Sequence, residues 1–417
     1  MDVLHPRCAG LDISKKDVKV CVRVQGGSAE GGRETLERTT TWGATTRRIL
    51  ALREHLVAEQ VSCVVMEATS DYWKPFYYLL EDLPGVELLL VNARHVKNLP
   101  GRKTDVSDAA WLAQLGAHGL IRASFVPPPP IRELRDLTRA RVMITRDRGR
   151  EVQRLEKQLE DAGIKLTGVA TDVMGVSARA MLEALIAGQR DPATLARLAK
   201  GRLRSKIPEL TDALLGRFTE HHAFMVRTHL RLIDQHTEAI DALTERIEGV
   251  IAPFRGFRDL ICSIPGISAQ VADVITAETG ADLSIFPTSG HLASWAGVCP
   301  GLNESAGKAK AGTTRPGNNY LKGALGTAAL SIARNQSRTT YLGARYRRIA
   351  ARRGNSRAIV AVEHTMLIAI WHMARTGELY DDPGPDFYTH LNPGRARKRA
   401  IQDLEALGYT VTLTKAS

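Results

Sequence analysis

The sequence lacks the features that mark membrane, secreted and zinc-finger proteins. No run of about 18 apolar residues occurs, so we expect no transmembrane helix. The N-terminal residues show no basic segment followed by an apolar stretch, so we expect no secretory signal and a cytoplasmic protein. The 5 cysteines stand singly, without a C-x-x-C pair, which argues against zinc fingers and disulfide scaffolds. We expect them to be small apolar core residues in a reducing compartment.

Basic residues exceed acidic ones. The 417-residue chain has 57 Lys and Arg against 45 Asp and Glu, a net charge of +12. This excess favours a polyanionic partner, because binding to phosphates releases counterions. We find no short basic amphipathic helix with aromatic anchors, so nucleic acid is a better partner than a membrane surface. The length predicts two or three folded units.

Residues 1–126 have an α/β pattern. Val18, Val20, Val22 and Val24 alternate with other residue types, as in a half-buried strand. We predict strands at residues 10–13, 18–24, 34–41, 61–66 and 86–91, and helices at residues 45–60, 70–83 and 104–119. Antiparallel strands followed by alternating helix and strand are typical of a ribonuclease-H-like fold, which we predict for this region.

A run of prolines at residues 127–130 breaks helix and sheet and predicts a domain boundary. We predict a helical region over residues 127–252, with long helices at residues 131–162 and 218–250. In the second helix, apolar residues recur every seven positions, at Val226, Ile233, Ile240 and Ile247. This pattern predicts a coiled-coil arm, and two helices packed inside one bundle fit it nearly as well.

Residues 253–417 contain more glycine, alanine and clustered arginine, and we predict a mainly α-helical C-terminal domain. Residues 263–269 are similar to the hairpin of a helix-hairpin-helix module, whose backbone N–H groups bind a DNA phosphate. Gly266 is the predicted contact. Ser268 stands where a second glycine is usual, and a plain helix-turn-helix packing unit fits about as well.

Four acidic residues stand where a metal site would need them. Asp12 ends the first predicted strand, Glu67 ends a buried strand, and Asp105 and Asp108 are spaced i, i+3 on one predicted helix face. Gathered carboxylates repel one another unless a cation lies among them, and oxygen ligands suit Mg²⁺ or Mn²⁺. Two such ions about 4 Å apart stabilise the attacking and leaving oxygens of a phosphodiester. Taken singly, each acid also fits a helix cap, a first helical turn or a surface turn.

A glycine-rich segment around Ser305 is the second stretch that contains candidate catalytic residues. Small neighbours let a backbone approach a phosphate, and Lys308, Lys310 and Arg315 supply positive charge. A serine hydroxyl attacks a phosphodiester when a base or a metal activates it. From these residues alone, a loop that only binds phosphate is the favoured explanation.

Together these pieces resemble the DEDD-type insertion-sequence transposases, relatives of the pilin-gene inversion recombinases, whose N-terminal domain resembles the RuvC resolvase. The resemblance covers nearly the whole chain. It rests on GLDISKK at 10–16, MEAT at 66–69, KTD at 103–105 with DA at 108–109, IPGI at 264–267, and residues 297–300, 304–308 and 317–321. Two departures stand out: Ala306 replaces a glycine found in several relatives, and residues 163–220 form a long insert.

The resemblance implies that Asp12, Glu67, Asp105 and Asp108 bind Mg²⁺ (or Mn²⁺), and that Ser305 forms a transient phosphoserine link to DNA. It implies donor and target DNA as partners, in a bacterial, nucleoid-associated setting. It implies a homo-oligomer, a dimer or a tetramer built through the coiled coil, in which two subunits contribute to each active site. In some members a structured noncoding guide RNA from the element pairs with both DNAs, and no membrane is involved.

Further basic residues are predicted to bind nucleic acid. Arg345, Arg348 and Arg352 share a predicted helix face and are placed to follow a phosphate backbone, with a merely solvated face as the alternative. Lys103 is also predicted to bind nucleic acid. Three functions remain: a serine recombinase, a structure-selective nuclease that uses water, and a noncatalytic nucleic-acid-binding protein. The complete set of acids and the long serine-bearing region favour the recombinase.

Overall fold

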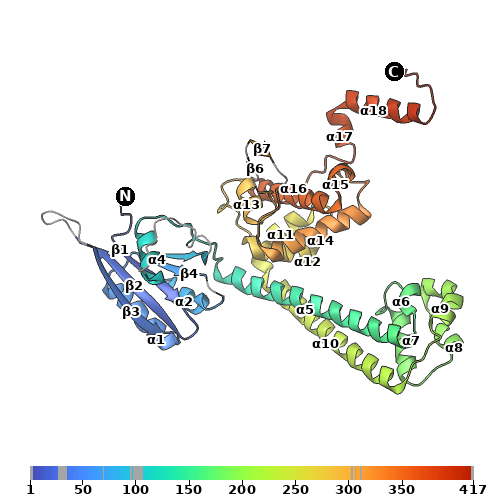
Figure 1. Ribbon diagram of the computed structural model, residues 1–417, viewed down its shortest axis with the longest axis horizontal. Coiled ribbons are helices and arrows are strands. Elements are labelled where there is room, and N and C mark those ends of the chain that lie inside the picture. The colour runs from blue at the N-terminus through green and yellow to red at the C-terminus, as the bar shows by residue number, and fades with distance from the viewer. Residues whose placement is uncertain are drawn as a thin grey trace. The chain divides into compact units, whose positions relative to one another are not determined.

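The computed structural model describes residues 3–26, 35–68, 70–93, 96, 107–301, 304–305, 307–309 and 312–414. The chain divides into two compact units, Met1–Pro127 and Pro128–Ser417 (Figure 1). Each unit is described by itself. Across the described ranges, no helix has both the length and the apolar character needed to span a membrane.

The first unit is built on a mixed five-stranded sheet with the order β3-β2-β1-β4-β5. β1 (Arg7–Ile13) pairs antiparallel with β2 (Asp17–Gln25), which pairs antiparallel with β3 (Thr35–Gly43). β4 (Cys63–Glu67) is parallel to β1, and β5 (Glu87–Val91) is parallel to β4. The strands predicted from the sequence are confirmed, with small shifts at their ends.

Two layers of helices cover the sheet. α1 (Thr46–Ala58) and α2 (Trp73–Leu80) pack on one face, where their buried side chains meet those of the strands. α4 (Asp108–Ala117) packs on the other face through small residues. A Cβ atom on Gly10 would lie 2.1 Å from the carbonyl oxygen of Ala109, so the absence of a side chain lets α4 lie directly on β1.

The cysteines of the first unit belong to this core. Cys8, Cys21 and Cys63 have no exposed surface, and all five cysteines of the chain are free thiols. A hydrogen bond with Cys63 and then burial raise the pKa of the Cys8 thiol. The prediction that the cysteines are apolar core residues is confirmed for these three.

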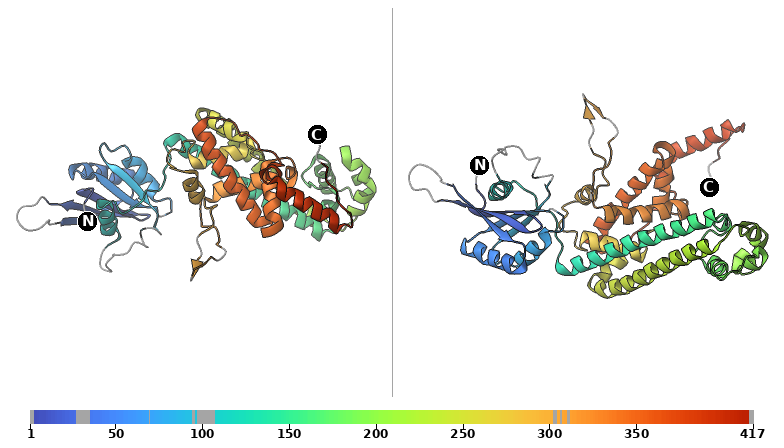
Figure 2. Two further views of the ribbon diagram at one scale, coloured as in Figure 1. Left: turned by 90° about the horizontal axis from the view of Figure 1, so that it is seen from above. Right: turned by 60° about the horizontal axis from the view of Figure 1, so that its bottom comes forward.

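The second unit begins with a pair of long helices. α5 (Pro129–Asp161) and α10 (Glu220–Val250) lie side by side over most of their length (Figures 1 and 2). Both helices were predicted. Their contact buries apolar side chains at its two ends, with Ile131, Leu134 and Ile247 at one end and the set Leu155, Leu159, Val226, Leu230 and Ile233 at the other. Whether they supercoil as a coiled coil stays a prediction.

Residues 163–220, here called the tip module, connect the far ends of α5 and α10. They form α6 (Leu166–Val169), α7 (Val176–Ile186), α8 (Pro192–Ala196), the 3₁₀ helix η1 (Gly201–Lys206) and α9 (Ile207–Ala213). Leu166, Met181, Leu182, Leu195 and Leu210 are fully buried in its core, which continues onto the ends of the two long helices. The insert is therefore a folded helical module.

The remaining residues are mostly helical, as predicted. The elements are η2 (Ala252–Phe254), α11 (Arg255–Cys262), α12 (Ala269–Thr279), α13 (Ser289–Trp295), β6 (Glu304–Ser305), β7 (Lys308–Ala309), α14 (Asn319–Asn335), α15 (Tyr341–Arg353), α16 (Asn355–Thr376), α17 (Phe387–Leu391) and α18 (Pro393–Ala406). α11 to α16 share one hydrophobic core, to which α12, α14 and α16 contribute Ile275, Leu325 and Met366.

Candidate functional site

Two of the predicted acids end neighbouring parallel strands. Leu11 of β1 lies opposite Met66 of β4 in the ladder, so Asp12 and Glu67 each follow at the same level. Neighbouring strands are about 4.8 Å apart. Leu11 and Met66 point into the core under α1 and α2, and alternation along a strand therefore places both acids on the face that carries α4.

The third acid, Asp108, opens α4. Ser107 has an extended backbone, and its Oγ accepts the N–H of Ala110 at 3.2 Å, so Ser107 is the N-cap and Asp108 is the first helical residue. α4 therefore begins four residues after the predicted start at residue 104, and the shared helix face of Asp105 and Asp108 stays a prediction. The hydroxyl cap decides where the helix begins. Asp105 and Lys103 lie outside the described residues.

Asp12 and Asp108 interact electrostatically. The pKa of Asp12 is raised, first by burial and then by the negative charge of Asp108, while Lys19 opposes the shift. The close contact between β1 and α4 at Gly10 brings the two carboxylates together. Two like charges held by rigid elements are the condition that a divalent cation relieves. Across the ranges that the structure describes, no group of three or more His, Cys, Asp or Glu side chains forms a metal-binding cluster.

The backbone of Ser305 belongs to a β-hairpin. Ser305 of β6 pairs with Lys308 of β7, and Gly307 in the turn between them has a φ of 71°. The hairpin is closed at its base, where the N–H of Gly301 donates to the carbonyl of Thr313 at 2.9 Å. Figure 2 shows β6 and β7 standing out from the helices of the second unit. Lys310 lies outside the described residues.

Glycines pack the base of this hairpin tightly. A Cβ on Gly312 would lie 2.0 Å from the carbonyl oxygen of Gly301, and a Cβ on Gly317 would lie 2.3 Å from that of Ala296. Only glycine allows these backbones to approach so closely. α14 begins shortly after these glycines, at Asn319.

Comparison with known proteins identifies the family of this chain. Residues 9–164 match a DEDD transposase family of the IS110 type, and residues 258–342 match the family described as "Transposase IS116/IS110/IS902 family". The two matches together cover more than half of the chain. The chain belongs to the IS110 transposase family. A curated relative, the insertion element IS110 uncharacterized 43.6 kDa protein of Streptomyces coelicolor, is 31% identical over 130 residues. The match spans 30% of this chain and 31% of that relative.

The two family matches contain different candidate site residues. The first match contains Asp12, Glu67 and Asp108, and the second contains Ser305 and Gly266. Nearly all of the tip module lies outside both.

A buried ionic cluster links α5 to the base of the hairpin. Glu278 of α12 has no exposed surface, and its two carboxylate oxygens accept hydrogen bonds from Arg139 at 2.7 and 2.8 Å. Asn318 caps α14 through its Oδ1 and donates from its Nδ2 to Glu278 at 2.6 Å. Sequence reasoning missed these residues, since the partners are up to 139 positions apart and no local pattern marks them.

A second buried carboxylate lies on the same helix. Asp273 of α12 accepts a hydrogen bond from Arg141 at 2.8 Å, and the guanidinium of Arg258 approaches it to 3.1 Å. Arg258 also forms a bidentate pair with Glu248 of α10. Burial raises the pKa of Asp273, although the two arginines oppose that shift. The two long helices are therefore tied to α11 and α12 by ion pairs at one end.

The predicted basic contacts differ in their surroundings. Arg315, Arg348 and Arg352 are exposed, whereas Arg345 is half-buried and donates to the hydroxyl of Tyr388 at 3.3 Å. The guanidinium of Arg348 lies over the ring of Tyr388, 4.4 Å from its centroid. Arg348 and Arg352 are accessible to a phosphate backbone, and Arg345 also has a structural role.

Gly266 lies between α11 and α12 with a φ of 84°. A Cβ there would lie 2.7 Å from the carbonyl oxygen of Ala328, so this residue packs closely against α14. This contact favours the plain helix-turn-helix packing unit. Phosphate binding at Gly266 stays a prediction. Trp371 packs against the same core and donates its Nε1–H to the carbonyl of Phe286 at 3.0 Å.

Proposed function

We propose that this IS110-family protein is a transposase that cuts and rejoins the DNA of an insertion element. One observation carries the proposal: the close contact between Gly10 and Ala109 holds α4 on β1, so that Asp108 lies near Asp12 at the end of the strand and adds to the effect of burial in raising the pKa of Asp12. Two carboxylates that rigid elements hold close together repel each other, and a bound cation would remove this repulsion. The strand order, with three antiparallel strands followed by two parallel ones, supports a RuvC-like, ribonuclease-H-like domain.

Asp12, Glu67 and Asp108, together with Asp105, would hold Mg²⁺ or Mn²⁺. When bound, such an ion stabilises negative charge that develops on a phosphodiester. Asp12 and Glu67 are carried by neighbouring strands, which fixes the distance between their backbones. Asp108 is carried by the capped N-terminal end of α4, which fixes the position of its backbone.

Ser305 would supply the nucleophile. Attack by its Oγ forms an oxygen–phosphorus bond and breaks the bond between phosphorus and a deoxyribose oxygen. The hydroxyl proton passes to a base, and the departing oxygen takes up a proton. One phosphodiester replaces another, so rejoining needs no external energy source. Lys308, paired with Ser305 in the hairpin, and Arg315 near its base would stabilise the phosphorane.

The partners follow from the same proposal. Donor and target DNA are the substrates, and a structured noncoding RNA from the element is the proposed guide. The assembly is a homo-oligomer, a dimer or a tetramer, formed through the α5–α10 arm. The exposed Met143 and Phe224, on these two helices, are apolar surface for such a contact.

Trapping of a covalent protein–DNA adduct tests the function. The full chain is incubated with donor-junction DNA, Mg²⁺ and RNA transcribed from the flanks of the element. We expect an adduct with the wild type and none with Ser305→Ala or Asp12→Ala. Ser356→Ala and Glu54→Gln, which alter exposed residues on α16 and α1, are matched controls and should form the adduct normally.

Each outcome assigns a mechanism. Loss of the adduct in both test variants supports a serine recombinase with a metal site. Cleavage that survives Ser305→Ala but not Asp12→Ala would instead identify a structure-selective endonuclease that uses water. Cleavage that survives Asp12→Ala would remove the carboxylates from the mechanism.

A further inference from the structure

The tip module carries a row of basic residues that none of the proposed chemistry uses. Lys200, Arg202, Arg204 and Lys206 fall within seven positions, on or next to η1, and all four are exposed. In segment 163–220, which is described in full, none of these four pairs with an acid. Other cations of the module do, since Arg179 pairs with Asp234 and Glu183. The row therefore has uncompensated positive charge.

Three of these residues line a cavity of about 630 Å³ between η1 and the start of α7. Lys200, Arg202 and Lys206 lie on one side, and residues 175–178 form another. The buried Ser177 accepts the backbone N–H of Lys200 at 2.8 Å, which fixes the start of η1 against the first turn of α7. Lys206 also donates to the carbonyl of Val169 at 3.2 Å. The cations are thus arranged around a defined hollow.

The first turn of α7 adds to this positive potential. Gly175 is the N-cap of this 11-residue helix, and no side chain caps it. The first N–H groups of an uncapped helix need acceptors from outside the helix, and its dipole favours an anion. Asp172 also lines the cavity, and its Oδ1 already accepts the N–H of Met174 at 2.9 Å. Three cations against one carboxylate leave the cavity positive.

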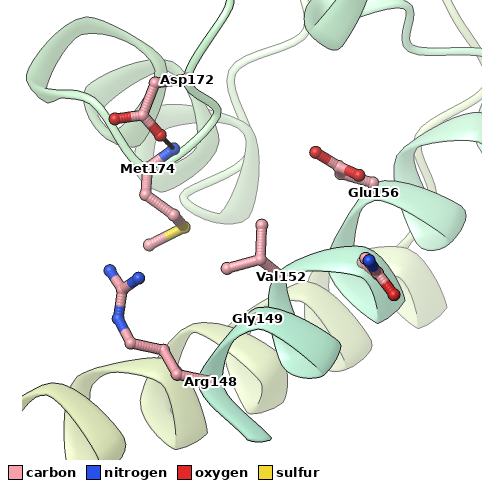
Figure 3. Close-up of a pocket in the computed structure, with 7 residues that line it drawn as sticks. Arg148, Gly149, Val152, Glu156, Asp172 and Met174 are labelled. Carbon is pink, nitrogen blue, oxygen red and sulfur yellow. Dashed lines mark hydrogen bonds between the residues drawn. The ribbon is translucent and has the colours of Figure 1, made fainter. Parts of the chain in front are cut away.

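A neighbouring cavity shows the contrast. A second hollow of about 470 Å³ shares Asp172 with the first, and Glu156 and Arg148 are its other charged side chains. Its lining residues are drawn in Figure 3. Its two carboxylates and one guanidinium give no excess of positive charge. The excess of positive charge is therefore found in the cavity beside η1 and not in this neighbouring hollow.

We propose that the tip module binds the phosphate backbone of duplex DNA through Lys200, Arg202 and Lys206. This inference rests on the proposed function, because a transposase must hold DNA beyond the bond that it cuts. No aromatic residue lines the cavity, whereas single-stranded RNA is usually held by stacking on aromatic rings. A 3₁₀ helix rises about 2 Å per residue, so η1 covers the phosphates of about three base pairs along one strand.

The length of α5 determines how far from the base of the arm the tip module would contact DNA. α5 has 33 residues, and at about 1.5 Å per residue it is roughly 50 Å long. The tip module lies at one end of this helix, and the cluster of Arg139 and Glu278 lies toward the other. A contact at the tip would therefore hold DNA roughly 15 base pairs beyond the base of the arm, given about 3.4 Å per base pair.

Salt-dependent DNA binding by the full chain tests the proposal. The probe is a mixed-sequence duplex longer than the arm, and the variant is Lys200→Gln, Arg202→Gln, Lys206→Gln. Each lost phosphate contact lowers the slope of log affinity against log salt by about 0.9, so we expect a slope shallower by about 2 to 3. The matched control Lys157→Gln, Arg227→Gln, Arg231→Gln removes the same charge from exposed positions on α5 and α10 and should leave the slope nearly unchanged. Circular dichroism confirms that both variants fold.

The outcomes separate this inference from the proposed function. A slope equal to that of the wild type, or an equal loss in the control, overturns the tip site. A loss of binding to the structured RNA of the element with no loss for duplex DNA overturns the assignment to DNA. The assay needs no cleavage, so a tip contact that persists in Ser305→Ala stands even where the covalent-adduct experiment fails. An intact adduct with an unchanged slope overturns the tip site alone.

Discussion

Arg139 of α5 holds the buried carboxylate of Glu278 through two hydrogen bonds, and that carboxylate also accepts from Asn318, the residue that caps α14. One carboxylate thus connects a long helix to the loop that closes the serine hairpin. Because the carboxylate of Glu278 is fully buried, the contact fixes geometry more firmly than a surface ion pair would.

We expect Glu278→Gln to destabilise the second unit. The substitution leaves the guanidinium of Arg139 without a counterion, which should cost about 3 kcal/mol of unfolding free energy, since Arg139 is partly exposed. Chemical denaturation measures this loss. Asp147→Asn removes one partner of an exposed pair with Arg150 and should cost less than about 1 kcal/mol. Equal losses in the two variants would contradict a special role for the buried pair.

We expect the acidic residues of the first unit to destabilise it when no metal is present. The pKa of Asp12 is raised, so the folded state binds this proton more tightly than the unfolded chain does. Stability therefore falls as pH rises from the usual aspartate range through the raised pKa, and it stays lower above that. Asp12→Asn removes this effect, so the variant should be more stable than the wild type at pH 7 and not below the aspartate range.

Divalent cations should reverse the order of stability of the wild type and Asp12→Asn. Mg²⁺ or Mn²⁺ should raise the melting temperature of the wild type and leave that of Asp12→Asn almost unchanged, because the ion neutralises the repelling carboxylates. Thermal denaturation with and without EDTA measures the difference. Glu54→Gln on the opposite face of the sheet should respond to the cation as the wild type does. A wild type that does not respond would remove the metal from the proposal.

Gly10→Ala should separate α4 from β1. The new Cβ would lie 2.1 Å from the carbonyl oxygen of Ala109, so the helix must shift, at a cost of about 1–3 kcal/mol. The shift moves Asp108 away from Asp12, and we expect adduct formation to fall with stability. Gly149→Ala is the control, since nothing lies within 4 Å of its added Cβ and alanine favours a helix by about 1 kcal/mol. The control should be as stable as the wild type or more so.

The arginines of α15 should divide into two classes. Arg348→Gln and Arg352→Gln should each make the slope of log affinity against log salt shallower by the amount that corresponds to about one phosphate contact. The melting temperature should change little. Arg345→Gln should lower the melting temperature, because this side chain donates to Tyr388 and to the carbonyl of Ala361. Fluorescence anisotropy with parallel melting curves measures both. Three identical responses would show that burial does not distinguish these residues.

Much of the fold could be predicted because local patterns are enough to specify it. The alternating valines of β2 and the apolar runs of β4 and β5 determine strands, since each buries one or both faces. The repeats in α5 and α10 determine long helices with one apolar side. Asp12 and Glu67 could be placed at strand ends for the same reason, and the Gly-rich segment around Ser305 could be recognised as a loop that closes before α14.

Other features depend on residues far apart in the sequence. The start of α4 was misplaced because more than one residue of this segment can cap a helix, and only the structure shows that Ser107 is the cap. The pairing of Arg139 with Glu278, and the hollow beside η1, arise only when separate helices are brought together. The sequence by itself determined which segments are strands and helices and which residues carry charge. The tertiary structure decided which of those charges meet, because burial and distance, which set electrostatic interactions, are properties of the folded chain.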